Sequence, residues 1–233
     1  MIRLVFRGTA RAVAAIAFVA SLASAQDARL VARFDARTVA AVTRVVDSAR
    51  TRSLPTEPLV QKALQGAAKR APSERVVAAV RELLGELAIA RASLGAHSTE
   101  PELVAGAGAL HAGVPGPILT RIRAARGARS VTVALATLAD LIARGVPVQG
   151  AVNAVLALAS RGAADAELLA FSTQVGRDIA AGAPPAVAVR VRSVSGAGAA
   201  AGGARPAPPV RPGNPTPPAG GGRPAGQVPP GPP

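Results

Sequence analysis

The chain reads Leu110-His111-Ala112-Gly113-Val114-Pro115, and nearly the same order of residue types returns as Ile142-Ala143-Arg144-Gly145-Val146-Pro147 and as Ile179-Ala180-Ala181-Gly182-Ala183-Pro184. A looser copy, Ala67-Ala68-Lys69-Arg70-Ala71-Pro72, lacks the glycine. Glycine just past the end of a helix accepts the left-handed conformation, and proline is well tolerated in the first turn of the next helix. Each copy of this Gly-(Val/Ala)-Pro turn therefore predicts that one helix ends and another begins.

A second signal recurs upstream of two of these turns. Thr56-Glu57-Pro58 and Thr99-Glu100-Pro101 each combine an N-cap residue, an acid for the first helical turn and an early proline. The two copies are 43 residues apart, and in both the proline of the next turn follows the threonine by 16 residues. The chain therefore contains an internal repeat, of a length typical of helical hairpins in α-solenoids.

We predict an all-α fold of short antiparallel helical hairpins over residues 26–193, followed by a disordered Pro/Gly-rich tail. The same helix-end and helix-start signals are compatible with either an α-solenoid-like stack or a compact helical bundle. The chain has no Cys, Trp or Tyr, and Phe34 and Phe171 are the only aromatic residues after residue 25. Ala, Val and Leu must therefore fill the core.

Residues 1–25 have the features of a secretory signal peptide. A basic start with three arginines is followed by a short apolar segment, residues 12–20, and by the small residues Ala23-Ser24-Ala25 before Gln26. Neither this segment nor any later one reaches the ~18 apolar residues that a membrane span needs. We expect cleavage between Ala25 and Gln26, export to the periplasm or the extracellular space, and no transmembrane span in the mature chain.

Residues 26–53 allow two interpretations. Arg29, Arg33 and Arg37 recur every four residues beside apolar neighbours, which is typical of a basic amphipathic helix on an anionic surface. Asp35 also fits the N-cap of a separate helix. We favour a terminal helix whose arginines face solvent.

The helical pattern stops after residue 193. Residues 195–204 are all Gly, Ala or Ser, and 12 of the 29 residues from Arg205 to Pro233 are proline. Such a composition supplies too little apolar surface to build a core. We predict a disordered basic tail over residues 194–233, with polyproline II character, that acts as a spacer or tether.

The charge of the chain favours an anionic partner. Removal of the three signal arginines from the 27 basic residues leaves 24 against 13 acidic residues, or about +11. The partner would be an envelope protein, an anionic envelope polymer or a lipid surface. The most basic local region supplies the candidate contacts, Arg121, Arg123, Arg126 and Arg129. The export signal and the scarcity of stacking aromatic side chains argue against nucleic acid.

Candidate groups for catalysis are few. His97 and His111 are the only histidines, and with Glu100 and Glu102 they would be the only choice for a metal site. The repeat aligns His111 with Ala68, and the two glutamates are explained as first-turn acids. The chain also lacks cysteine and a Gly-x-Ser-x-Gly motif. We therefore assign no catalytic, cofactor-binding or metal-binding residue.

These features predict an exported, non-catalytic helical-repeat protein that serves as an interaction or scaffold module of the cell envelope. Two alternatives remain open. One is a metal-dependent hydrolase that uses His97, His111 and nearby carboxylates, and the other is a structural protein without a specific ligand.

Overall fold

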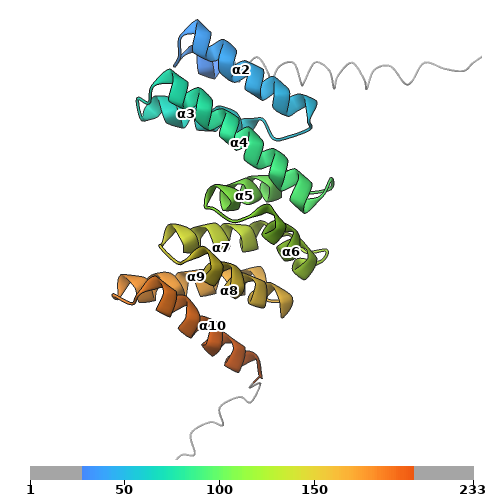
Figure 1. The fold of residues 1–233 in the computed structure, drawn as a ribbon, viewed down its shortest axis with the longest axis vertical. Helices are drawn as coiled ribbons and strands as arrows, with labels where there is room; N and C mark the ends of the chain where they lie inside the picture. The colour runs from blue at the N-terminus through green and yellow to red at the C-terminus, as the bar shows by residue number, and fades with distance from the viewer. Residues whose placement is uncertain (1–27, 202–233) are drawn as a thin grey trace, which may run out of the picture.

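Nine helices, α2 to α10, follow a helical turn at residues 28–31 in the part of the chain that the computed structural model describes. That part is residues 28–201, with side chains as far as residue 194. The helices are α2 (Ala36–Thr51), α3 (Glu57–Ala68), α4 (Ser73–Leu94), α5 (Glu100–His111), α6 (Gly116–Arg126), α7 (Thr132–Ala143), α8 (Val148–Ser160), α9 (Asp165–Ala180) and α10 (Pro185–Ala201). These residues contain no strand, so the predicted all-α fold is confirmed (Figure 1).

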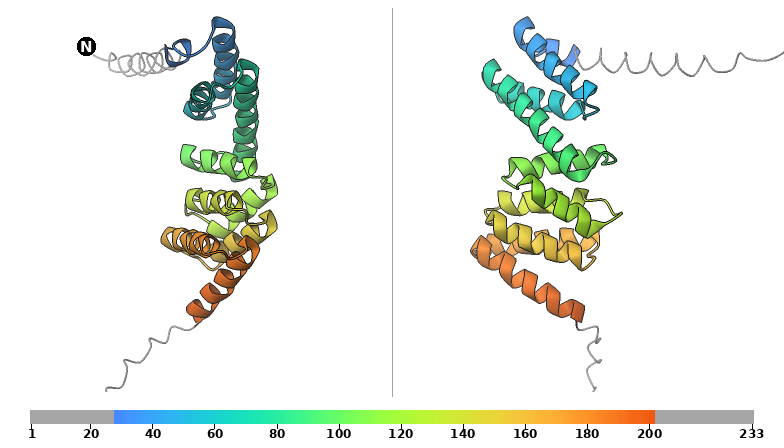
Figure 2. Two further views of the ribbon diagram at one scale, coloured as in Figure 1. Left: turned by 90° about the vertical axis from the view of Figure 1, so that its left-hand side faces the viewer. Right: turned by 45° about the vertical axis from the view of Figure 1, so that its right-hand side comes forward.

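The helices stack in two layers. In one layer α2 packs on α4, α4 on α6, α6 on α8 and α8 on α10, and in the other α5 packs on α7 and α7 on α9. The left-hand view of Figure 2 shows the layers beside each other. Every pair of helices with substantial packing is one or two positions apart in chain order. Of the two predicted architectures, the structure is therefore the solenoid-like one, in which each unit contacts only its neighbours.

The three Gly-(Val/Ala)-Pro turns end their helices as predicted. Gly113, Gly145 and Gly182 have positive φ angles of 91°, 86° and 98°. After Gly113, the Val114 N–H donates to the Ala109 carbonyl oxygen at 3.0 Å, and Val114 itself is buried. This bond satisfies a carbonyl group that the helix end would otherwise leave unpaired. Each turn thus ends a helix and places an apolar residue into the core.

The same turn also forms without glycine. In the looser copy Arg70 has a φ of 53°, and the Ala71 N–H donates to the Gly66 carbonyl oxygen at 3.0 Å. Ser53, also at 53°, ends α2 in the same way. The turn at Arg70 was predicted from its similarity to the other three copies. The turn at Ser53 has no glycine and was not predicted.

The predicted 43-residue repeat is confirmed in α3 and α5. Both helices have 12 residues, and they begin 43 positions apart. The spacing between turns falls to 32 for the next unit because α4 has 22 residues and α6 has only 11. The 11 extra residues of α4 make up about three helical turns. The chain therefore leaves α4 in nearly the same direction as it would leave a helix of 11 residues. The longer α4 packs against α2, α3, α5 and α6 and joins the first helices to the later stack.

The N-terminal basic segment is divided. The chain leaves helical conformation between residues 32 and 35, and Asp35 caps α2 by accepting from the Arg37 and Thr38 backbone N–H groups, both at 3.0 Å. The predicted N-cap is confirmed. Arg29 and Arg37 consequently lie on separate elements and not on one continuous amphipathic helix.

The helical region extends further than predicted. α10 runs to Ala201, although we placed the start of the tail at residue 194. Residues 195–201 contain no proline and several alanines, and alanine has the highest helix propensity. The signal peptide, its cleavage site at Ala25 and Gln26, and the tail beyond residue 201 lie outside the described residues. Within the described part, no helix combines the length and the apolar character needed to cross a membrane.

Replacing Gly113 with alanine should destabilise the protein by about 1–2 kcal/mol, because alanine is strained at a φ of 91°. No atom would obstruct the added methyl group, so backbone strain alone is tested. Gly108→Ala is the matched control: this exposed residue within α5 also leaves room for a methyl group, and the change should stabilise by about 0.5–1 kcal/mol. Urea unfolding followed by circular dichroism measures both. Equal effects of the two changes would contradict the assigned turn.

Candidate functional site

The four arginines predicted to meet an anionic partner differ in their surroundings. Arg121 is exposed on α6. Arg126 is only 3% exposed, donates to the carbonyl oxygens of Ser130 and Ala163 at 3.0 and 2.8 Å, and forms an ion pair with Asp165. Arg129 donates to the Gly162 carbonyl oxygen at 2.8 Å, and Arg123 pairs with Glu102 at 2.8 Å. Three of the four therefore join α6 and the following loop to other parts of the fold.

Glu102 is the buried acid of this network. Its side chain accepts from the backbone N–H groups of Thr99 at 3.0 Å and Val131 at 3.1 Å, and it pairs with Arg123. Burial alone would raise the pKa of Glu102, but the hydrogen bonds and the charge of Arg123 outweigh it and lower the pKa to about 2. Glu102 thus stays ionised and connects α5, α6 and the start of α7.

The two histidines do not form a joint site. His97 lies in the loop before α5 and lines a depression that Glu102 and Arg123 also line. His111 is the last residue of α5, so the length of a 12-residue helix, about 18 Å, separates the two positions. His111 instead lies beside Glu82 and Glu86 of α4. The sequence suggested different carboxylates because it did not reveal how α4 crosses the end of α5.

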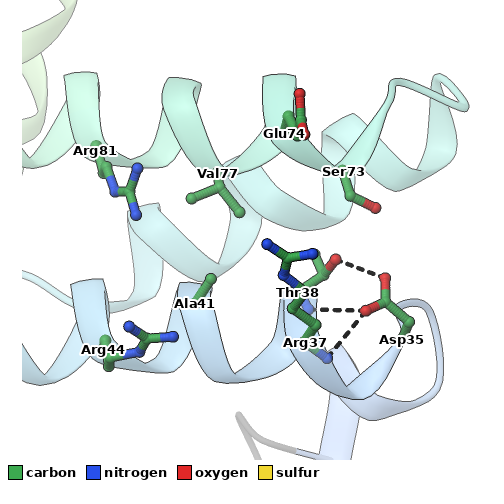
Figure 3. A pocket seen from close by; sticks show the side chains of 9 residues that line it. All are labelled: Asp35, Arg37, Thr38, Ala41, Arg44, Ser73, Glu74, Val77 and Arg81. Atoms are coloured by element: carbon green, nitrogen blue, oxygen red, sulfur yellow. Dashed lines mark hydrogen bonds between the residues drawn. The ribbon is translucent and has the colours of Figure 1, made fainter.

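A groove between α2 and α4 is the strongest candidate site for a partner (Figure 3). The beginnings of the two helices lie opposite each other, and so do Arg44 and Arg81 further along. Ala41 and Val77 face each other between the helices. The groove has a volume of about 540 Å³.

Three arginines give the groove its charge. Arg37 and Arg44 project from α2 and Arg81 from α4. All three are exposed, and within the described part of the chain none of them forms an ion pair. Arg44 donates from Nε to the Ala40 carbonyl oxygen at 3.1 Å. Its two terminal NH₂ groups and the guanidinium groups of Arg37 and Arg81 keep their N–H donors available for an anion.

Two acids, Asp35 and Glu74, also line the groove and offset part of this charge. The carboxylate of Asp35 accepts the Thr38 hydroxyl at 2.6 Å and the two backbone N–H groups of its cap. These bonds, led by that of the Thr38 hydroxyl, lower the pKa of Asp35, which therefore stays ionised as a helix cap. Glu74 is exposed in the first turn of α4, where the helix dipole favours an acid. With three arginines and two acids, the groove keeps an excess of one positive charge.

Sequence reasoning missed this groove. The usable signal was the spacing of Arg37 and Arg44, two helical turns apart on a helix that begins after Asp35. The contribution of Arg81 could not be seen, because it depends on how α2 packs against α4. No protein-family model, curated protein or solved structure matches the chain.

Glu102→Gln should lower the free energy of unfolding at pH 7 by about 2–3 kcal/mol, since it removes a buried charge from its three partners. The folded-state pKa of about 2 lies below the ordinary 4.5, so this stabilisation is present above pH ~4.5 and is lost as the pH falls towards 2. The variant should therefore have a flatter pH dependence of stability in that window, measured by urea unfolding.

Glu167→Gln is the control for this prediction. Glu167 also accepts the N–H of its helix cap, Ala164, at 3.1 Å, but it is exposed. We expect a loss below about 1 kcal/mol. An equal loss in both variants would show that the cap bond, and not the buried network, stabilises the fold.

Proposed function

We propose that the protein is an exported, non-catalytic interaction or scaffold protein whose groove between α2 and α4 binds an anionic partner in the cell envelope. The observation that carries the proposal is the convergence of three arginines from two helices without an acidic partner among the described residues. Some other arginines of the fold are already paired, as Arg29 is with Glu57 and Arg192 with Asp178. Arg33 and Arg121 are exposed but do not line this groove.

The chemistry of the groove suits binding better than proton transfer. A guanidinium group stays protonated at physiological pH, so Arg37, Arg44 and Arg81 can hold a carboxylate or phosphate but cannot serve as acid or base. Asp35 is engaged in capping α2. The solenoid supplies a fixed frame for such a surface, because its helices present their side chains at defined spacing.

The spacing of the arginines indicates how the negative groups of the partner would be spaced. Arg37 and Arg44 are seven residues apart on one helix, which places them about 10 Å apart along its axis. A chain with repeated negative groups, such as an anionic polymer or an acidic protein segment, can meet both and also reach Arg81 across the groove. Each contact would be exposed and therefore weakened by salt.

A double charge reversal, Arg44→Glu with Arg81→Glu, should weaken binding of the mature protein to fluorescent polyglutamate at least about tenfold at low salt. The matched control reverses two exposed arginines elsewhere, Arg33→Glu with Arg121→Glu, and carries the same net charge. Fluorescence anisotropy gives both affinities, and about 0.5 M salt should abolish the difference. An equal loss in both double variants would assign binding to net charge, and no saturable binding by the wild type would favour a structural protein without a ligand.

Export gives a separate prediction. When the full chain is expressed in a bacterium with a general secretory pathway, the mature protein should begin at Gln26 and be recovered outside the cytoplasm. Intact-mass measurement after fractionation tests this. Retention of residues 1–25 would indicate an uncleaved anchor.

A further inference from the structure

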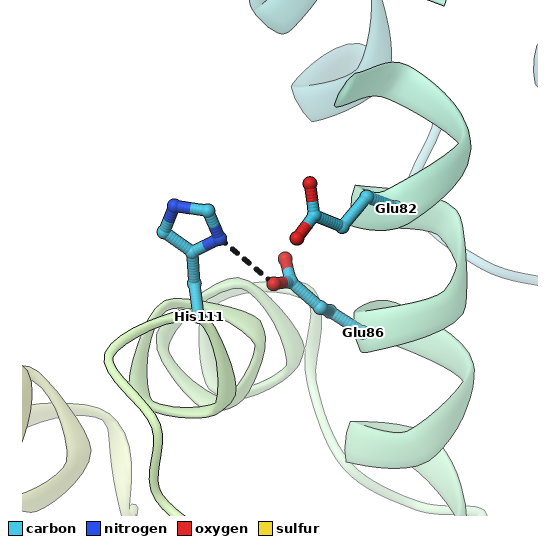
Figure 4. A group of neighbouring side chains, drawn as sticks. All are labelled: Glu82, Glu86 and His111. Carbon is cyan, nitrogen blue, oxygen red and sulfur yellow. Dashed lines mark hydrogen bonds and ion pairs between the residues drawn. The ribbon is translucent and has the colours of Figure 1, made fainter. Parts of the chain in front are cut away.

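We infer that Glu82, Glu86 and His111 form a binding site for one divalent transition-metal ion, with Zn²⁺ as its best probe. The site joins α4 to the end of α5 (Figure 4). It is separate from the groove between α2 and α4, so the two proposals can fail independently.

The three side chains offer ligand atoms at one place. Glu82 and Glu86 are four residues apart on α4 and so share one face of that helix. His111 comes from α5 and turns its ring nitrogen Nδ1 towards them, 2.9 Å from the Glu86 carboxylate oxygen Oε1. One ligand atom from each residue lies within 4.8 Å of the other two.

Charge balance supports a cation at this position. Two carboxylates on adjacent turns repel each other, and the side chain of Glu86 is only 14% exposed. His111 is the one basic group that forms an ion pair with either acid among the described residues. An imidazole carries at most one positive charge, so it cannot balance both carboxylates. A divalent ion can.

The donor set indicates the kind of ion. One imidazole nitrogen and two carboxylate oxygens suit Zn²⁺ and neighbouring transition metals, whereas Mg²⁺ prefers an all-oxygen shell. Bonds of about 2.0–2.2 Å require ligand atoms about 3.3 Å apart in a tetrahedral site. The Nδ1–Oε1 pair is already near this separation, and Glu82 is exposed, so its side chain can rotate inward. Three protein ligands leave a position that water can fill.

The two histidines of the chain make a direct test possible. In the untagged mature protein, Zn²⁺ added to one equivalent should shift or broaden the NMR signals of the His111 ring and leave those of His97 unchanged. Mg²⁺ at the same concentration should shift neither. Equal responses of the two rings to Zn²⁺ would overturn the proposal, because they would indicate non-specific binding.

Variants test the carboxylates. Glu82→Gln and Glu86→Gln should each weaken Zn²⁺ binding at least about tenfold in calorimetric titration, and His111→Ala should remove the Zn²⁺-dependent rise in unfolding temperature. Glu74→Gln changes an exposed acid on the same helix and should retain wild-type affinity. Circular dichroism checks that each variant is folded. Wild-type affinity in either Glu82→Gln or Glu86→Gln would refute the three-ligand site.

Discussion

The left-handed residue at the end of a helix is the constraint on which this fold depends. It turns the chain so that the next N–H reaches back to a carbonyl group and the next apolar residue enters the core, as Val114 and Val146 do. The five connections of four residues between α3 and α10 have this geometry. A core without disulfides and almost without aromatic side chains needs such close connections. Gly106 of α5 illustrates the packing, since a Cβ atom there would lie 3.0 Å from that of Ala90 in α4.

The length of α4 determines where function can reside. Its extra residues amount to about three full turns, so the direction in which the chain leaves α4 towards the next helix is nearly unchanged. α4 is nevertheless longer than the helices that follow. One part of its surface faces α2 and carries Arg81, and another faces the end of α5 and carries Glu82 and Glu86. Residues at successive positions of a helix point about 100° apart, which is why Arg81 and Glu82 belong to different sites.

The sequence could predict what local chemistry decides. The Gly-(Val/Ala)-Pro turns, the cap at Asp35 and the 43-residue offset of α3 and α5 all follow from residues close in the chain. Thr56 was also predicted to cap α3, but its side chain makes no cap hydrogen bond. The solenoid was one of two architectures that the same signals allowed. The groove and the cluster around His111 were not predictable, because each joins residues at least 25 positions apart through helix packing. Glu102 looked like an ordinary first-turn acid, and nothing local indicated that Val131 and Arg123 would enclose it.

Net charge alone therefore does not locate a binding surface in this protein. The region richest in arginine, around α6, uses much of that charge internally: Arg123 and Arg126 have acidic partners, and Arg129 binds backbone carbonyl groups. The region around α2 and α4 has a less basic sequence but keeps Arg37, Arg44 and Arg81 without ion pairs among the described residues. An anion binds an arginine most favourably where no carboxylate is already paired with that arginine. Displacing the carboxylate of a buried ion pair would leave its negative charge uncompensated. The pairing of each arginine, and not the local count of arginines, makes the groove the better candidate.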